Sequence, residues 1–398
     1  MKKKIFIHIP YLEIGGAEIS LIGLLNSVDY SKYGVDLFIS KHSGELMQLI
    51  PPVVKVFPEN VKYSMILSPI KCAIRQAWSI AFARLLAKFR CKIWRLNRCN
   101  DKEDYSIFQY VAKYTSPILP QISNQEYDLA ISFLTPHNIC LEKVIAKRKV
   151  AWIHTDYSTI SVNAELEFPI WKAYDKIISI SDDVTTSFLK VFPSLSDKIV
   201  KIENILSPQF VRQRAELFTV DDEMPRVDGW VNLLSVGRFC YAKNYDNVPD
   251  ICRRLIELGC DVRWYIIGYG GEEELIQQRI IEARMEDRVV ILGKKTNPYP
   301  YIKACDIYVQ PSRYEGKSVT VREAQMLCKP VVITNYATAS SQIKDGIDGV
   351  IVPMDNEDCA VGIKSLIDNR EKQKELSYFL SKNDYGNEKE VEKLYDLI

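Results

Sequence analysis

Residues 311–324 read PSRYEGKSVTVREA, follow the apolar run Ile307–Gln310 and lead into a helical stretch, Val319–Leu327. A strand, a turn with glycine and a helix start form a geometry that binds phosphate, because unpaired backbone N–H groups and the positive end of the helix point at an incoming anion. Ser318 is placed to cap this helix. The stretch therefore predicts an anion site at the end of a strand in a parallel α/β sheet.

Two glutamates stand in this stretch, Glu315 in the turn and Glu323 more than one turn into the helix. Sugars and ribose present vicinal hydroxyls, and a carboxylate accepts from two of them through hydrogen bonds of roughly 1.5 to 3 kcal/mol each. We expect both carboxylates to face a cleft at different depths. A capping residue plus a surface charge would give the same spacing by chance.

The same alternation of short β-branched runs and helical segments fills both halves of the chain, which is typical of parallel α/β sheets. We predict one doubly wound, Rossmann-like domain in each half. The predicted strands are Ile5–Ile9, Val35–Ile39, Leu129–Phe133, Val150–His154 and Lys176–Ile180 in the first half, and Val231–Val236, Val262–Ile267, Val289–Leu292, Ile307–Gln310 and Pro330–Thr334 in the second.

The chain has 398 residues, more than one compact core usually holds, so two domains are expected. The segment Ser207–Gly229 carries two prolines, an acidic cluster and little apolar periodicity, which favours a connection between domains. We place the first domain at 1–207 and the second at 208–380. Ligands of open parallel sheets bind beyond the carboxyl ends of the strands, so the site is expected in a cleft between the domains.

Charge and cysteine content exclude several classes of protein. Lys plus Arg (52) and Asp plus Glu (51) nearly balance, so the overall charge indicates no nucleic-acid partner. The ten cysteines form no Cys-x-x-Cys pair, which argues against zinc and favours packed thiols in a reducing compartment. The apolar run after the basic start is too short for a signal peptide and is better explained as a first strand.

The segment 60–100 differs from the rest because it holds nine basic residues, interleaved aromatics and no acidic residue. Basic amphipathic helices with aromatics can lie on an anionic bilayer, and each basic residue contributes about 1 kcal/mol there. We expect membrane contact through residues 62–98; a solvated pair of basic helices is the alternative. The basic residues are Lys62, Lys71, Arg75, Arg84, Lys88, Arg90, Lys92, Arg95 and Arg98.

The spacing of Glu315 and Glu323, followed by LCKPVVIT at 327–334, resembles the large retaining GT-B glycosyltransferase family (family 4-like, group 1) that includes bacterial capsule and lipopolysaccharide sugar transferases. The resemblance implies two Rossmann-like domains facing across a cleft, the first for the acceptor and the second for a nucleotide sugar, with a C-terminal helix at 381–398 crossing back to the first domain. Further segments of the chain resemble segments of the family and follow in the same order. They are Gly15–Glu18, Ser235–Asn244, Ile266–Glu272, Ile291–Lys294 and Asp345–Pro353.

The resemblance also implies the roles of individual residues. Arg238 and Lys243 correspond to the pair that holds the donor diphosphate, and cations there would stabilise the charge that develops on the leaving oxygens. No convincing Asp-x-Asp site lies beside them, so we expect metal-independent catalysis without a cofactor. Where many members have Phe-Gly after Glu315-Gly316, this chain has Lys317-Ser318. The expected donor-binding residues are Gly16, Arg238, Lys243, Lys294, Glu315, Gly316, Lys317, Ser318, Val319 and Glu323.

His154 closes a predicted strand, and by resemblance it reaches the donor sugar from the first domain. With Glu315, Arg238 and Lys243 it forms the expected catalytic set. In a retaining enzyme without an obvious nucleophile, the departing phosphate oxygen can take the acceptor proton on the same face. We therefore expect His154 to orient the donor and stabilise the oxocarbenium-like state. A structural, hydrogen-bonded histidine is the alternative.

The expected activity is transfer of a sugar, with retention, from a UDP-linked donor rather than a GDP-linked one to a saccharide acceptor. By charge and family habit, the acceptor is expected to be lipid-linked and the protein to be a cytoplasmic, peripheral one at the inner face of the cell membrane, acting in surface polysaccharide synthesis. A GT-B epimerase or phosphorylase and a non-catalytic sugar-nucleotide binding protein remain alternatives. A dinucleotide oxidoreductase is disfavoured because Gly268, Gly270 and Gly271 lack the Gly-x-Gly-x-x-Gly spacing.

Overall fold

The computed structural model describes residues 2–96 and 103–398, so Arg98 of the basic segment lies outside the described residues. The chain divides into two compact units, one made of Met1–Leu206 with Asn387–Ile398 and the other of Ser207–Gly386. Each unit has its own parallel sheet and its own core of apolar side chains. We call them unit 1 and unit 2.

Unit 1 is built on a seven-stranded parallel sheet in the order β3-β2-β1-β5-β6-β8-β9. Strand order reverses between β1 and β5, whose registers pair Ile5 with Leu129 and Ile7 with Ile131. The five strands predicted in this half are all present. The strands are β1 (Lys3–Ile9), β2 (Tyr33–Ile39), β3 (Lys55–Val56), β5 (Glu126–Ser132), β6 (Ile145–Ile153), β8 (Lys176–Ser179) and β9 (Ile199–Lys201), with a separate pair β4 (Glu103–Asp104) and β7 (Ile160–Ser161).

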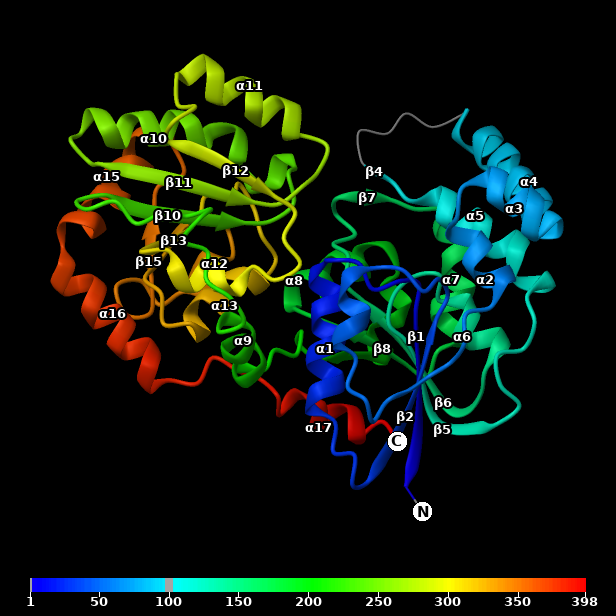
Figure 1. The fold of residues 1–398 in the computed structure, drawn as a ribbon. Coiled ribbons are helices and arrows are strands. Elements are labelled where there is room, and N and C mark those ends of the chain that lie inside the picture. The colour runs from blue at the N-terminus through cyan, green and yellow to red at the C-terminus, as the bar shows by residue number, and fades with distance from the viewer. Residues whose placement is uncertain (1, 97–102) are drawn as a thin grey trace. The chain divides into compact units, whose positions relative to one another are not determined.

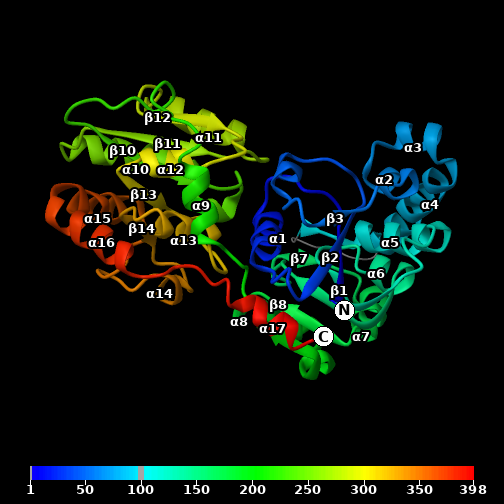
Figure 2. The ribbon, with the colours of Figure 1, turned by 60° about the horizontal axis from the view of Figure 1, so that its bottom comes forward.

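The helices of unit 1 include a group, α2 to α5, that gathers at one end of the unit (Figures 1 and 2). Buried Ala87 and Cys91 of α4 pack on Tyr110 of α5, which joins the two longest members of the group. The helices are α1 (Gly16–Ser27), α2 (Val61–Leu67), α3 (Ile70–Gln76), α4 (Trp78–Arg95), α5 (Ser106–Thr115), α6 (Asn138–Lys143), α7 (Ala164–Ala173), α8 (Asp182–Val191) and α17 (Glu390–Tyr395).

Unit 2 has a six-stranded parallel sheet in the order β12-β11-β10-β13-β14-β15, which reverses between β10 and β13. Helices α10 and α11 lie on one face and α12 and α13 on the other (Figure 1), so the strands are apolar on both sides. The strands are β10 (Val231–Val236), β11 (Val262–Ile267), β12 (Val289–Gly293), β13 (Ile307–Gln310), β14 (Val331–Thr334) and β15 (Val350–Val352). The helices are α9 (Pro208–Ala215), α10 (Val248–Glu257), α11 (Glu273–Ala283), α12 (Tyr299–Ala304), α13 (Val319–Met326), α14 (Ala339–Gln342), α15 (Asn356–Asp368) and α16 (Arg370–Lys382).

Two segments differ from the sequence-based expectation. The connection expected at 207–229 begins with helix α9, because the Ser207 side chain accepts a hydrogen bond from the Phe210 N–H and Pro208 fits the first helical turn. The C-terminal segment is not one helix over 381–398, since only Glu390–Tyr395 are helical after α16 ends. Helix α9 has the cap and proline signals of a helix start, but its eight residues are too few to show a clear apolar periodicity.

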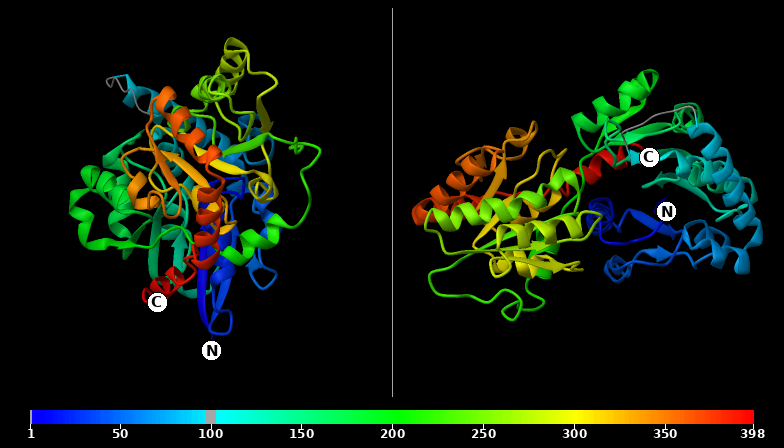
Figure 3. Two further views of the ribbon diagram at one scale, coloured as in Figure 1. Left: turned by 90° about the vertical axis from the view of Figure 1, so that its left-hand side faces the viewer. Right: turned by 90° about the horizontal axis from the view of Figure 1, so that it is seen from above.

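Helix α17 belongs to unit 1 (Figure 3). The ring of Tyr395 stacks on that of Tyr33 with centroids 4.1 Å apart, and its hydroxyl accepts a hydrogen bond from the Asp29 N–H at 2.8 Å. Asn387 accepts from the Leu206 N–H at 2.9 Å and donates to the Asn204 carbonyl at 2.9 Å. These contacts fix the end of the chain to unit 1.

Replacement of Gly23 by alanine tests how closely α1 packs in unit 1. A Cβ at Gly23 would overlap the carbonyl oxygen of Ile205, whereas one at Gly34 would meet nothing within 4 Å. Glycine-to-alanine changes inside helices usually stabilise by about 1 kcal/mol, but overpacking costs roughly 1 to 3 kcal/mol. We expect Gly23→Ala to lower the midpoint of urea unfolding and Gly34→Ala to leave it nearly unchanged. A higher midpoint for Gly23→Ala would show that the packing is looser than described.

Candidate functional site

The loops that follow β10 and β13 meet where the strand order of unit 2 reverses, the usual place for a ligand in such a sheet. There the Lys243 ammonium lies 2.5 Å from Oε1 of Glu315. The same oxygen accepts hydrogen bonds from the Ser312 hydroxyl at 2.7 Å and the Gln310 amide at 3.3 Å. Glu315 is therefore held in one orientation by three donors, and Lys243 is held beside it.

Backbone contacts fix the position of Lys243. It ends a short turn, Tyr241–Lys243, which is followed by Asn244 in the left-handed conformation at φ 61°. The Asn244 amide donates to the Pro311 carbonyl at 2.9 Å, and the Arg313 N–H donates to the Ala242 carbonyl at 2.8 Å. The two loops are thus tied together on both sides of the ion pair.

Arg313 forms a second ion pair between the two loops, with Asp246. Its guanidinium donates to both carboxylate oxygens of Asp246, at 2.9 and 2.7 Å, and lies 4.2 Å from the centroid of the Tyr241 ring. A planar guanidinium with a bidentate partner and an aromatic face is strongly oriented. The Arg313 side chain is therefore held by partners within the two loops.

Three glycines allow the loops to approach. A Cβ at Gly237 would lie 2.7 Å from the Tyr245 hydroxyl and 3.1 Å from Cε of Lys243. A Cβ at Gly268 would overlap the Gly237 carbonyl, and one at Gly270 would overlap that of Phe239. The glycines after β11 are thus explained by packing against the unit's own loop.

The remaining cations predicted for this site differ in exposure. Arg238 follows Gly237 and is exposed, while Lys317 is half-buried just before α13. Lys294 is exposed in the loop after β12, with its ammonium 4.9 Å from the centroid of the Tyr269 ring. Gly316 is exposed and has open space where a Cβ would lie.

Helix α13 begins as predicted, at Val319, but its cap differs. Ser318 occupies the N-cap position without a side-chain cap hydrogen bond. Its hydroxyl pairs with that of Thr320 at 3.1 Å, and its backbone N–H donates to Gln342 at 3.0 Å. The expected capping role of the Ser318 side chain is therefore wrong, because Gln342 and Thr320 compete for the groups involved.

Glu323 lies inside unit 2. It is fully buried, its Oε1 accepts a 2.7 Å hydrogen bond from the Tyr299 hydroxyl, and its Oε2 has no partner. Burial raises the pKa of this carboxyl to about 7. The structure brings Lys243 and Glu315 together but places the Glu323 carboxyl against α12, so a contact with a ribose or sugar stays a prediction.

Unit 1 holds the other two predicted residues, Gly16 and His154. Gly16 is the first residue of α1 and has open space where a Cβ would lie, whereas Gly15 is closely approached by the Glu18 carboxylate. His154 follows β6, and its ring lies 4.6 Å from that of Phe133. Both ring nitrogens of His154 are buried without a partner, and burial lowers its pKa to about 3. The imidazole is therefore neutral near pH 7.

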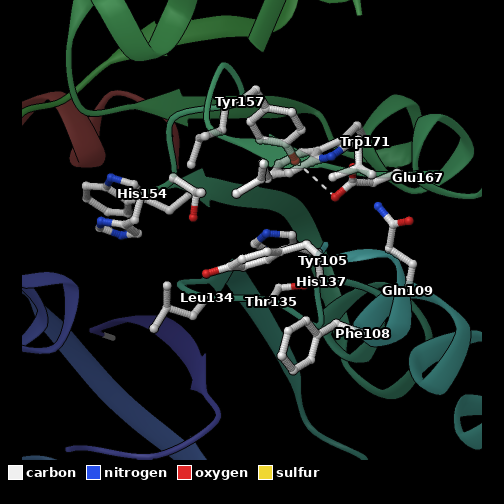
Figure 4. A pocket seen from close by; sticks show the side chains of 15 residues that line it. Tyr105, Phe108, Gln109, Leu134, Thr135, His137, His154, Tyr157, Glu167 and Trp171 are labelled. Atoms are coloured by element: carbon white, nitrogen blue, oxygen red, sulfur yellow. Dashed lines mark hydrogen bonds between the residues drawn. The ribbon is translucent and has the colours of Figure 1, made fainter. Parts of the chain in front are cut away.

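His154 also lines a pocket of unit 1 (Figure 4). On another wall, Glu167 of α7 is buried, and its Oε1 accepts a 3.0 Å hydrogen bond from the Tyr157 hydroxyl. Burial raises the pKa of Glu167 to about 7. Sequence reasoning missed Glu167; its signal was a carboxylate four residues before Trp171, on an otherwise apolar helical face.

Residues 2–96 and 103–398 contain no group of three or more His, Cys, Asp or Glu side chains that could hold a metal ion. Within the same residues, no helix is both long and apolar enough to cross a bilayer. Catalysis without a metal stays a prediction.

Comparison with known proteins shows what the chain is similar to. Residues 226–382, all within unit 2, match the family model described as glycosyl transferases group 1. A Campylobacter jejuni relative, N-acetylgalactosamine-N,N'-diacetylbacillosaminyl-diphospho-undecaprenol 4-alpha-N-acetylgalactosaminyltransferase, is 29% identical over 34% of this chain and 37% of its own. The amylovoran biosynthesis glycosyltransferase AmsD of Erwinia amylovora is 26% identical over 42% of this chain and 47% of its own. The matches thus span less than half the length of these two relatives.

Solved structures cover nearly the whole chain. HepE of Anabaena, solved in complex with UDP and glucose, superposes with a TM-score of 0.65 at 16% identity, covering 99% of this chain and 98% of that one. A glycosyltransferase of Rickettsia africae gives a TM-score of 0.66 at 14% identity, covering 100% of this chain and 97% of that one. At these identities the likeness establishes the fold, and the predicted GT-B architecture of two parallel-sheet α/β domains is confirmed.

The buried carboxyl of Glu323 predicts a pH-dependent stability. Its folded pKa of about 7 lies above the unfolded value of 4.5, so the folded state holds the extra proton between these values. The stability contributed by the protonated form is complete below pH 4.5 and is lost as the pH rises through 7. We expect Glu323→Gln to be more stable than the native chain at pH 8, by about 3 kcal/mol at most, and similar to it near pH 4.5. Urea unfolding across this range measures the difference.

The matched control is Glu274→Gln, an exposed glutamate of α11 in the same unit. Its difference from the native chain should stay small and constant with pH. A constant difference for Glu323→Gln as well would contradict the buried position of this carboxyl.

Proposed function

We propose that this chain is a retaining, metal-independent glycosyltransferase that moves a sugar from a UDP-linked donor to a hydroxyl of a lipid-linked saccharide in surface polysaccharide synthesis. The group 1 domain over residues 226–382 supports transfer from a sugar donor. The UDP and glucose held by HepE support a UDP-linked donor, and the printed names of the Campylobacter and Erwinia relatives support a lipid-linked or polysaccharide acceptor.

The observation that carries this proposal is the pair of Lys243 and Glu315 at the reversal point of the unit 2 sheet. In the proposed complex, Lys243 and the exposed Arg238 bind the diphosphate oxygens and stabilise the charge that develops when the sugar leaves. Glu315, already oriented by Ser312 and Gln310, accepts hydrogen bonds from sugar hydroxyls through its remaining lone pairs. Cation and carboxylate then bind two chemically different parts of one donor, its diphosphate and its sugar.

The proton of the acceptor hydroxyl goes to the departing phosphate oxygen on the same face of the sugar, so no side-chain base is required. The bond from the anomeric carbon to phosphate oxygen breaks as the bond to the acceptor oxygen forms. A neutral His154 suits this scheme, because it can orient donor hydroxyls without supplying or removing a proton. Phosphate charge is balanced by Lys243 and Arg238 in place of a metal.

We also propose that the protein associates with the cytoplasmic face of the cell membrane through α4. Six large apolar side chains recur on this helix and at its end at spacings of three or four residues, so they share one face. They are exposed, with Trp78 at 75%, Phe82 at 66% and Phe89 at 61%. The full stripe consists of Trp78, Phe82, Leu85, Phe89, Ile93 and Leu96.

The opposite face of α4 packs into the core of unit 1. Ile80, Ala83, Ala87 and Cys91 are buried there, so the stripe is not a second half of the same core. Lys88, Arg90 and Lys92 are exposed on the same helix, and no acidic residue stands between 60 and 96. Aromatic side chains with flanking cations match an anionic bilayer surface.

Not every basic residue of the segment is available for lipid. The Arg84 guanidinium donates to the carbonyls of Met65 and Ser68 at 2.7 and 2.6 Å, and Arg95 pairs with Asp104. These two side chains hold α4 to its neighbours. On α4, the lipid-facing charge is therefore assigned to Lys88, Arg90 and Lys92.

Thermal stabilisation by UDP-, GDP-, ADP- and CDP-sugars in the presence of EDTA tests the donor site. We expect UDP-sugars to raise the melting temperature of the native chain, and Arg238→Ala and Lys243→Ala to lose most of that shift because each removes a diphosphate contact. Lys374→Ala, an exposed lysine of α16, should keep it. Equal stabilisation of all the variants, or none by any nucleotide sugar in a folded protein, would reject this donor site.

Flotation with lipid vesicles tests the role of α4. We expect the native chain to float with vesicles containing phosphatidylglycerol and not with pure phosphatidylcholine. A variant with serine at Trp78, Phe82 and Phe89 should stay unbound, since it loses the apolar face. Glutamine at Lys88, Arg90 and Lys92 should weaken partitioning by roughly 100-fold, at about 1 kcal/mol for each charge.

The matched control for the serine variant changes three exposed apolar residues of unit 2, Ile281, Val361 and Tyr378, to serine. It should float like the native chain. If the α4 serine variant also floats like the native chain, or if the native chain binds no vesicle, the membrane proposal is wrong.

A further inference from the structure

The turn 315–318, which carries Glu315 and leads into α13, is held by a second segment of unit 2. We call residues 334–342, which end β14 and run through α14, the bracing segment. Three of its side chains make hydrogen bonds to backbone atoms of residues 312–318, across 22 to 24 positions of sequence. They are Thr334, Thr338 and Gln342.

The turn itself contains a residue that leaves its backbone free to move. Gly316 is exposed and has open space where a Cβ would lie. Glycine has the largest conformational freedom of all residues, so a turn built on it stays in one conformation only if other groups hold it. The position of Glu315 therefore depends on contacts from outside the turn.

Gln342 completes the start of α13 from outside the helix. In a capping box, the third helical residue is Glu or Gln, and its side chain accepts a hydrogen bond from the N–H of the N-cap residue. Helix α13 has Ser318 at the N-cap but valine, Val321, at the third position. Gln342 supplies the missing contact, because its Oε1 accepts from the Ser318 N–H at 3.0 Å and its Nε2 donates to the Ser318 carbonyl at 2.5 Å.

The orientation of the Gln342 amide is itself fixed. The hydroxyl of buried Tyr336 donates to Oε1 of Gln342 at 3.1 Å, beside the bond from the Ser318 N–H. Two donors on one oxygen leave the amide nitrogen facing the Ser318 carbonyl. One side-chain amide thus holds both polar atoms of the Ser318 backbone.

Thr338 holds the other end of the turn. It lies at the N-cap of α14, where threonine usually caps its own helix, but its side chain makes no cap hydrogen bond there. Its hydroxyl donates to the Glu315 carbonyl at 2.8 Å. The Thr334 hydroxyl adds a bond to the Ser312 carbonyl at 2.5 Å. The polar side chains of the bracing segment are therefore directed at the residues around Glu315.

We propose that Gln342 and Thr338 are positioning residues that hold the turn 315–318 in the conformation in which Glu315 receives the hydroxyls of the donor sugar. The inference rests on the proposed function, because it concerns the same donor. Both residues act through the backbone of the turn, and a turn that is already ordered binds more tightly than one that must be ordered by its ligand. Lys243 and Arg238 belong to the other loop, after β10, so the bracing segment acts on the sugar more than on the diphosphate.

Isothermal titration calorimetry of the full chain tests these roles. The probes are UDP and its conjugates with glucose, galactose, N-acetylglucosamine and N-acetylgalactosamine. We expect Gln342→Met to weaken binding of the tightest UDP-sugar about tenfold and Thr338→Val about fivefold, because one or two hydrogen bonds to the turn are lost. Binding of UDP alone should change less than about twofold in both variants, since it has no sugar to place against Glu315.

The matched control is Gln373→Met in α16. The Gln373 amide also donates to backbone carbonyls of unit 2, those of Leu366 and Ile367 at 2.7 and 3.2 Å. This variant should lower the midpoint of urea unfolding at least as much as Gln342→Met but leave the ratio of UDP-sugar to UDP affinity at its native value. The ratio thus separates positioning from a general loss of stability. Thr338→Val removes a single hydroxyl and keeps the test informative if Gln342→Met does not fold.

The remaining outcomes separate this inference from the proposed function. If both variants keep the native affinity ratio, or weaken UDP as much as the UDP-sugar, the inference is overturned while the donor site stands. If UDP binds the native chain but none of the four UDP-sugars does, the inference is overturned as well, because the turn receives no sugar. If the folded native chain binds neither UDP nor any UDP-sugar, the proposed function fails and the inference fails with it.

Discussion

The ion pair of Lys243 and Glu315 depends on two loops that leave neighbouring strands, β10 and β13, at the point where the sheet of unit 2 reverses its order. Without the glycine at Gly237, a side chain would press on Lys243 from the end of β10. Without the Asn244 hydrogen bond to Pro311, the turn that carries Lys243 would lose its tie to the other loop. The apolar strands bring the loops together, and the glycines and amides then set the distance between cation and carboxylate.

The two units offer chemically different sites. Unit 2 gathers Lys243, Arg238 and Glu315 at strand ends, which suits a ligand with a charged part and a hydroxylated part. The pocket of unit 1 has aromatic walls, a buried carboxyl and imidazoles whose pKa burial lowers to about 3, and no lysine or arginine lines it. An anion is therefore stabilised beside Lys243 and would lie without a cation in the pocket of unit 1.

Much of this could be predicted from sequence, because buried parallel strands are apolar along their whole length and therefore conspicuous. The ten predicted strands are present, and the junction of Lys243 and Glu315 follows from residues placed directly after two of them. Edge strands such as β3 and β9 were missed because they are two or three residues long. The Tyr299 hydroxyl of α12 orients Glu323 of α13, and the Tyr157 hydroxyl orients Glu167 of α7. Neither contact could be predicted from the spacing of residues along the chain. The burial of these two carboxyl groups depends on residues that are distant in the sequence, so it could not be predicted from local patterns.

The most direct measurement of the central claim is the ³¹P NMR spectrum of UDP titrated with the full chain in EDTA, compared between the native protein, Lys243→Met and Lys374→Met. Methionine keeps most of the length of the lysine side chain but removes its charge. If Lys243 binds the diphosphate, both phosphorus resonances should shift with the native chain and with Lys374→Met, and remain close to free UDP with Lys243→Met. Equal shifts with all three proteins would contradict the claim that this junction is the diphosphate site.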